Sequence, residues 1–147
     1  MIQNWFECKI RYEKTMENGM VKKVTEPYLV DALSFTEAEK RIIEEITPFM
    51  SGEFEVSDIK RAHYSELFFT DDPDADLWFA SRLEFITLDE RTGTEKKTKT
   101  SILIQASDIR DAMKRLDKGM EKTLADYNAV SIKETAIMDV YPYKEKV

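Results

Sequence analysis

Cysteine, histidine and glycine are scarce in this 147-residue chain, and each scarcity excludes a class of function. One cysteine, Cys8, cannot form an internal disulfide, and with the single histidine, His63, it cannot supply the ligands of a typical zinc site. The four glycines all fall in expected turns or helix ends, so they make neither a G-x-G-x-x-G motif nor a P-loop. ATPases, kinases and dinucleotide enzymes are therefore disfavoured, and we expect no metal and no cofactor.

Long hydrophobic runs and an excess of positive charge are also missing. No apolar run approaches the roughly 20 residues that a membrane span requires, and residues 1–5 lack the basic and apolar segments of a signal peptide. We therefore expect a cytoplasmic protein without a membrane partner, a setting that agrees with the single cysteine. The formal net charge of −7 would repel nucleic acid unless the chain carries a local basic patch.

No reactive constellation of side chains is visible, so we expect a binding protein and not an enzyme. A G-x-S-x-G signature is absent, and His63 has no evident nucleophile or orienting carboxylate. The acidic run 71–76 has alternating aspartates, as the start of a calcium loop does. Leu77 and Leu83 stand where that loop needs glycine and glutamate, which favours a solvated linker.

The sequence consists of two similar halves, in which equivalent residues are about 73–74 positions apart. The equivalent segments are Trp5-Phe6 and Trp78-Phe79, Lys9-Ile10 and Arg82-Leu83, Leu29-Val30-Asp31-Ala32 and Leu103-Ile104-Gln105-Ala106, and Ile59-Lys60 and Ile132-Lys133. This self-similarity predicts two copies of one supersecondary unit related by a pseudo-two-fold axis. We expect a single domain over 1–147, with repeat 1 at about 1–70, an acidic linker at 71–76 and repeat 2 at about 77–147.

Hydrophobic periodicity predicts the elements of each repeat. Alternation predicts strands, and a Ser or Asp followed by one apolar stripe predicts a capped helix. In repeat 1 these are strands at 5–15 and 21–32, a helix capped by Ser34, and an extended stretch at 53–69 with a bulge near Ser57-Asp58. In repeat 2 they are strands at 77–89 and 96–106, a helix capped by Asp108, and a strand at 129–141. Residues 142–147 are expected to fray.

These elements predict an α+β fold: two tandem strand–strand–helix–strand repeats forming an antiparallel sheet with both helices on one face. Whether the two halves of the sheet are continuous is left open by the sequence. If Phe6 and Ile10 face the helices, then Trp5, Lys9 and Arg11 face the opposite, open side. By the same alternation Trp78 and Arg82 face that side in repeat 2. The neighbouring strands add Lys22, Lys23, Lys96, Lys97 and Lys99.

Aromatic rings beside a basic groove are how sequence-tolerant proteins bind single-stranded nucleic acid. The predicted nucleic-acid-binding residues are Trp5, Lys9, Arg11, Trp78, Arg82, Lys22 and Lys97. Two other interpretations remain open. The tryptophans could be buried in a dimer interface or against the other repeat, and the lysines could protect sheet edges from aggregation.

Three segments resemble a family of small uncharacterised proteins, a domain of unknown function found in Bacteroides-group bacteria and their phages. They are Asn4-Trp5-Phe6-Glu7-Cys8-Lys9, residues 26–39 (EPYLVDALSFTEAE) and residues 135–143 (TAIMDVYPY). The resemblance covers nearly the whole chain and implies a prokaryotic or phage cytoplasmic protein, but it carries over no activity and no site residue. In plan the tandem repeats also look like the Pur-alpha and Whirly single-strand binders, whose repeats have four strands before the helix.

Our leading hypothesis is a non-enzymatic protein that holds single-stranded nucleic acid on an open sheet face. The alternative is a phage or mobile-element accessory protein that sequesters a nucleotide-like small ligand or binds a protein partner as a homodimer. Loss of salt-sensitive oligonucleotide binding in the Trp5→Ala, Trp78→Ala double variant would support the first hypothesis.

Overall fold

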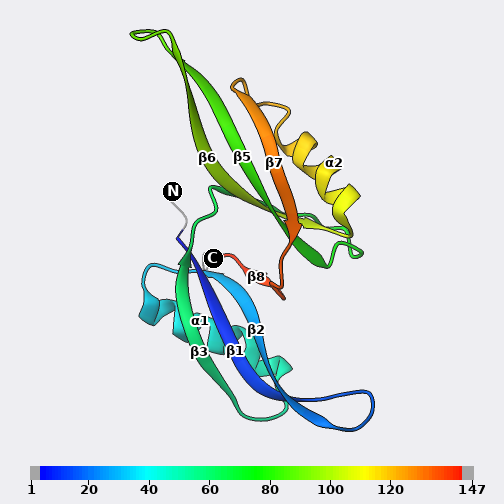
Figure 1. The fold of residues 1–147 in the computed structure, drawn as a ribbon. Coiled ribbons are helices and arrows are strands. Elements are labelled where there is room, and N and C mark those ends of the chain that lie inside the picture. The colour runs from blue at the N-terminus through cyan, green and yellow to red at the C-terminus, as the bar shows by residue number, and fades with distance from the viewer. Residues whose placement is uncertain (1–3, 144–147) are drawn as a thin grey trace. The chain divides into compact units, whose positions relative to one another are not determined.

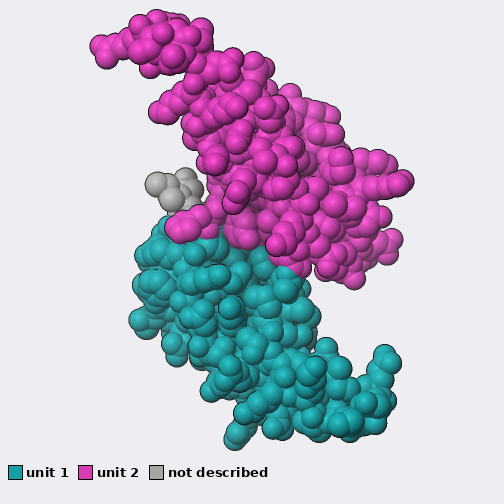
Figure 2. Space-filling view, in the orientation of Figure 1, with its two compact units in different colours: residues 1–62, 136–147 teal, residues 63–135 magenta. Residues whose placement is uncertain are grey.

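The computed structural model describes residues 4–143, which form an α+β fold of eight strands, two α-helices and one short 3-10 helix. Two compact units are distinguished by their internal contacts (Figure 2). Unit 1 combines the chain up to Ala62 with the chain from Ala136 onward, and unit 2 contains the residues between them. These units differ from the expected repeat boundaries of 1–70 and 77–147.

Unit 1 is built on a four-stranded sheet with the order β3-β1-β2-β8 (Figure 1). The central strand β1 (Trp5–Thr15) pairs antiparallel with β2 (Val21–Asp31) on one side and with β3 (Phe54–Ala62) on the other. The short strand β8 (Val140–Tyr141) pairs parallel with β2. Gly19, with φ 81°, makes the tight turn between β1 and β2, because this left-handed backbone suits a residue without Cβ.

Helix α1 (Phe35–Ile46), followed by the 3-10 turn η1 (Thr47–Phe49), covers one face of this sheet. Ser34 caps the helix as predicted: its hydroxyl accepts a hydrogen bond from the backbone N–H of Glu37 at 3.1 Å. The core of unit 1 contains alternate residues of the sheet and one stripe of the helix. Its buried members are Phe6, Cys8, Ile10, Val30, Ala32, Ala38, Ile42 and Ile46.

Unit 2 has a second four-stranded sheet, with the order β4-β6-β5-β7. Its central strand β5 (Leu77–Asp89) pairs antiparallel with β6 (Thr94–Ala106) and with β7 (Asp126–Glu134). The short strand β4 (Glu66–Phe68) pairs parallel with β6. The β5–β6 hairpin continues beyond the end of its pairing with β7, which stops at Ile86 (Figure 1).

Helix α2 (Ile109–Gly119) covers one face of the unit 2 sheet. Asp108 caps it, as predicted, by accepting a hydrogen bond from the backbone N–H of Asp111 at 2.8 Å. The buried core on this side repeats the arrangement of alternate sheet residues and one helix stripe. It contains Phe79, Leu83, Ile102, Ile104, Ala106, Ala112, Leu116 and Met120.

The prediction of an antiparallel sheet carrying both helices is wrong in two respects. The described strands form two sheets, each with its own helix, and each sheet includes one parallel pair. The expected extended stretch 53–69 is split into β3 and β4, and the expected strand 129–141 into β7 and β8. Alternation of apolar residues indicates an extended segment but not the strand with which that segment pairs. The divisions between β3 and β4 and between β7 and β8 therefore could not be predicted from neighbouring residues.

The predicted bulge at Ser57-Asp58 is confirmed. Lys9 is opposite Asp58 and Ile10 is opposite Val56, so Ser57 is the extra residue of β3. Its hydroxyl donates a hydrogen bond to the carbonyl of Lys9 at 3.3 Å.

Candidate functional site

Both predicted stacking residues lie on the sheet face away from the helix, but neither ring is accessible. Trp5 and Trp78 are each only 3% exposed, and neither belongs to the helix-side core of its unit. Leu29 and Leu103, the two leucines on the corresponding faces of β2 and β6, are fully buried. The helix-free faces near these tryptophans are therefore covered, and the open aromatic platform expected from the alternation is absent.

Trp78 is covered in part by the segment that precedes β5. The ring of Phe69 meets the Trp78 ring edge-on, with centroids 5.6 Å apart. Gln105, the cross-strand neighbour of Trp78, accepts a hydrogen bond from the Thr70 backbone N–H at 3.1 Å and donates one to the Ala75 carbonyl at 3.0 Å. Gln105 thus holds the acidic linker over this end of the sheet, both just before its first residue and near its last.

The predicted basic residues of unit 1 are neutralised or separated. Arg11 forms an ion pair with Glu55 at 3.6 Å, and Lys9 is half-buried beside its cross-strand partner Asp58. Lys22 is paired in register with Lys14, on the same face as the core residues of β1. Lys22 therefore lies on the opposite side of the sheet from Lys9 and Arg11.

The predicted residues of unit 2 have a different environment. Arg82 and Lys97 are exposed on the face of the sheet that α2 leaves uncovered. The register places Lys99 on the same face, one row from each of them, and Lys133 on the other side of Arg82 on β7. We call Arg82, Lys97, Lys99 and Lys133 the basic face of unit 2.

The basic face carries positive charge that no close carboxylate balances. Within residues 4–143, none of its four side chains has a carboxylate oxygen within 4.0 Å. The acidic residues on this face are Glu84, opposite Lys99, Asp126, opposite Ile86, and Glu95, opposite Leu88 in the row beyond Lys97. Lys99 and Lys97 each share a row with one acidic residue, whereas the rows of Arg82 and Lys133 contain none, so the excess of positive charge lies around Arg82 and Lys133.

Sequence reasoning missed Lys133, although a signal for it existed. The pair Ile132-Lys133 is the repeat equivalent of Ile59-Lys60. The register shift between Arg82 and Leu83 sets which β7 side chains share a face with Arg82. Lys60 itself forms an ion pair with Glu7 at 3.2 Å, whereas Lys133 has no carboxylate oxygen within 4.0 Å among the residues that the structure describes.

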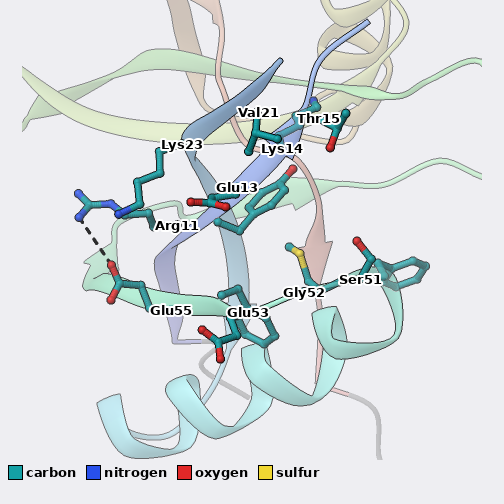
Figure 3. Close-up of a pocket in the computed structure, with 14 residues that line it drawn as sticks. Arg11, Glu13, Lys14, Thr15, Val21, Lys23, Ser51, Gly52, Glu53 and Glu55 are labelled. Carbon is teal, nitrogen blue, oxygen red and sulfur yellow. Dashed lines mark ion pairs between the residues drawn. The ribbon is translucent and has the colours of Figure 1, made fainter. Parts of the chain in front are cut away.

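A hollow of about 820 Å³ lies in unit 1 between the β1–β2 hairpin, η1 and the start of β3 (Figure 3). Its aromatic lining is Tyr12, Phe49 and Phe54, and Phe49 is 80% exposed. Its charged lining is balanced: Arg11, Lys14 and Lys23 face Glu13, Glu53 and Glu55. A hydrogen bond with Glu26 raises the pKa of Tyr12 to about 12, so this phenol stays protonated at neutral pH.

Within residues 4–143, no helix has the length and apolar character needed to cross a membrane. No curated protein matches the chain. One family model does match it, described as a domain of unknown function, DUF4494, and the match extends over residues 4–143. Because that match covers nearly the whole sequence, the chain belongs to the DUF4494 family.

Proposed function

We propose that this protein is a non-enzymatic binding protein that holds single-stranded nucleic acid on the basic face of unit 2. The observation that carries the proposal is the group of four exposed bases without a close carboxylate, on a chain whose net charge is −7. A local patch of this kind is what an acidic protein requires to bind a polyanion.

The arrangement of the four bases favours one phosphodiester backbone. Lys133, Arg82, Lys99 and Lys97 occupy successive rows of the sheet and trace a diagonal from β7 across β5 to β6. Rows on one face are about 6.6 Å apart along the strands. A single extended strand can follow such a line. Ser101 and Ser131, both in register with Arg82, add hydroxyl groups that can bind phosphate oxygens.

The burial of the tryptophans changes the expected mode of binding. With Trp5 and Trp78 each 3% exposed, base stacking on these rings is replaced in the proposal by contacts to phosphates. Binding is then tolerant of sequence and strongly dependent on salt. The Trp5→Ala, Trp78→Ala variant is a poor test, since truncating a buried tryptophan costs about 3–5 kcal/mol of stability.

Fluorescence anisotropy of a labelled single-stranded oligonucleotide, titrated at several salt concentrations, tests the proposal. With four phosphate contacts, log Kobs should fall against log[salt] with a slope of about −3. The Arg82→Gln, Lys97→Gln variant should weaken binding and reduce the steepness of that slope by about 1.4.

The matched control is Lys14→Gln, Lys22→Gln, which removes the same charge from the helix side of unit 1. This variant should keep both the affinity and the slope of the wild type. Equal losses in the two double variants would show that only net charge matters. Absence of binding at low salt would reject the proposal.

The hollow in unit 1 supports a second candidate, sequestration of a nucleotide-like small ligand. Its three aromatic side chains offer a ring to stack on, and Lys14 and Lys23 are without a close carboxylate within residues 4–143. A thermal shift with mononucleotides that is lost in Phe49→Ala would favour this candidate, because the exposed Phe49 ring contributes little to the core. A thermal shift that is unchanged in Phe49→Ala would show that the mononucleotide does not bind in the hollow.

We also infer that the segments β1–β2–α1–β3 and β5–β6–α2–β7 are tandem copies of one strand–strand–helix–strand repeat. Equivalent positions support this: the register shifts at Lys9/Ile10 and Arg82/Leu83, and the caps Ser34 and Asp108. We further propose that the protein comes from Bacteroides-group bacteria or their phages. We also propose that it lies in the cytoplasm, where Cys8 stays reduced.

A further inference from the structure

Each sheet takes its fourth strand from the end of the other repeat. β4 follows β3 in the chain but pairs with β6, in unit 2. β8 follows β7 but pairs with β2, in unit 1. The two short strands occupy equivalent positions, since Leu67-Phe68 and Val140-Tyr141 are separated by the repeat offset. The exchange is therefore reciprocal.

The contacts of β8 are specific and extend beyond its two paired residues. The backbone N–H of Met138 donates to the Pro27 carbonyl at 2.8 Å, and that of Leu29 donates to the Asp139 carbonyl at 3.0 Å. Val140 is only 6% exposed. The Tyr141 ring stacks on Tyr28, with centroids 6.2 Å apart.

In each unit an arginine on the helix contacts the residues that follow the short strand, β8 in unit 1 and β4 in unit 2. Arg41 of α1 donates hydrogen bonds to the carbonyls of Asp31 and Pro142, and its guanidinium lies 5.5 Å from the centre of the Tyr143 ring. Arg115, the repeat equivalent on α2, forms ion pairs at 2.9 Å with Asp111 and at 3.0 Å with Asp72, beyond β4.

The connection that brings β8 to unit 1 has no regular structure. Residues 135–139 lie in neither a helix nor a strand. All the contacts of β8 depend on residue types that a second copy of the chain also carries. β8 of a second copy can therefore pair with the edge of β2 in the first copy, which is the condition for strand exchange between subunits.

We propose that two copies of this chain form a closed dimer in which β8 of each copy completes the unit 1 sheet of the other. The partner is a second copy of this chain. The surface is the edge of β2 at Leu29-Val30 together with Arg41. The proposal is independent of nucleic-acid binding, because β8 and the basic face belong to different units.

A cysteine pair distinguishes exchange between copies from exchange within one chain. Leu29 and Val140 are Cα partners in the parallel ladder, so the full-length Leu29→Cys, Val140→Cys variant places two thiols at disulfide range. After refolding at increasing protein concentration and oxidation, a non-reducing denaturing gel should show a covalent dimer whose share grows with concentration. A covalent product that stays monomeric at every concentration overturns the proposal. The variants Leu29→Cys and Val140→Cys alone, each of which retains Cys8, report any dimer formed through other pairs.

Light scattering on a size-exclusion column provides a second measurement that needs no engineered thiol. The wild-type chain should contain a dimer that a concentrated refolding step enriches. The Val140→Asp variant should lose that dimer. A charged aspartate cannot take the buried place of Val140 beside β2, whether β2 belongs to the same copy or to the other one. The control Val130→Asp changes an exposed valine on β7 and should keep it. A dimer that persists in Val140→Asp, or a wild-type chain that stays monomeric after concentrated refolding, overturns the proposal.

Discussion

At the scale of the residue, the single cysteine is placed where its chemistry is suppressed. Cys8 is fully buried among Phe6, Ile10 and the apolar stripe of α1. Burial, reinforced by the negative charge of Glu7, raises the pKa of its thiol to about 12. The thiolate is the nucleophile, so the side chain is inert at neutral pH and acts as a small apolar residue.

We therefore predict that Cys8 in the native protein does not react with an aromatic disulfide reagent at pH 8. Labelling should become complete in denaturant, and at intermediate denaturant its rate should follow the fraction of open molecules. The absorbance of the released thiolate measures this. Prompt stoichiometric labelling of the native protein would contradict the burial of Cys8.

Asp111 makes the stability of unit 2 dependent on pH. Its carboxylate accepts hydrogen bonds from the Ser107 backbone N–H at 3.0 Å and from the Arg115 side chain at 2.9 Å. These bonds, that of Ser107 first, hold the pKa of Asp111 below its usual value of 3.8. A lowered pKa in the folded state stabilises the protein above pH 3.8, and this contribution disappears as the pH falls through the folded-state pKa.

Replacing Asp111 by Ala should accordingly reduce the free energy of unfolding by about 1 kcal/mol at pH 7. The difference from wild type should begin to shrink below about pH 4, where Asp111 of the unfolded chain becomes protonated, and should disappear as the pH falls through the lower pKa of the folded state. Urea unfolding followed by circular dichroism at several pH values measures both free energies. An equal difference at pH 7 and pH 3 would show that the hydrogen bonds of the ionised form are unimportant.

At the scale of the element, the joint between β4 and α2 depends on one glycine. A Cβ placed on Gly119, the last residue of α2, would lie 2.5 Å from the Phe68 ring of β4. That ring packs against the core of unit 2, so it cannot move without disturbing its neighbours. Glycine is needed here for close approach, since its backbone is not in the left-handed region.

The Gly119→Ala substitution should destabilise the protein by about 1–3 kcal/mol, despite the better helix propensity of alanine. In the background of Phe68→Ala the same substitution should cost little, because the colliding ring is gone. The control is Gly52→Ala, where an added Cβ meets no atom within 4 Å. Chemical denaturation of the four proteins of the Gly119–Phe68 cycle tests the coupling. Additive effects would exclude it.

At the scale of the whole molecule, unit 1 depends on the far end of the chain. Ile137 and Val140 are each 6% exposed and belong to unit 1, although more than seventy residues separate them from Ala62 in sequence. Burial of two aliphatic side chains contributes on the order of 3–6 kcal/mol. Truncation after Thr135 removes this contribution from unit 1 and leaves the strands and core of unit 2 intact.

Hydrogen exchange can resolve this difference between the units. In the truncated chain we expect amide protection to fall along β1 and β2 and to persist along β5 and β6. Peptide-resolved mass spectrometry of both forms measures it. A uniform loss of protection over all four strands would mean that the two units unfold together and that β8 has no local role.

Local patterns in the sequence sufficed for most of the elements. Alternation around Phe6 and Phe79 predicted β1 and β5, and Ser34 and Asp108 predicted the helix starts, because strand pleat and helix caps depend on neighbours within a few residues. The bulge at Ser57 was visible for the same reason. Membership of a family of unknown function was also accessible from short segments alone.

The candidate site was predicted only in part. Arg82 and Lys97 share an exposed face as expected, whereas Trp5 and Trp78 are buried and Arg11 is paired with Glu55. Periodicity assigns a side chain to a face of a sheet. It does not say what covers that face or which charge lies opposite, since both depend on residues distant in sequence.

The sequence by itself determined the long strands β1, β2, β5 and β6, the two capped helices and the apolar side chains that each of them contributes to a helix-side core. Only the tertiary structure decided that β4 and β8 change partners, that the strands form two sheets and that the tryptophans are covered. The physical reason is the separation in sequence over which each kind of interaction acts. Propensity, pleat and capping are local energies, whereas strand pairing and burial depend on which distant surfaces exclude water together.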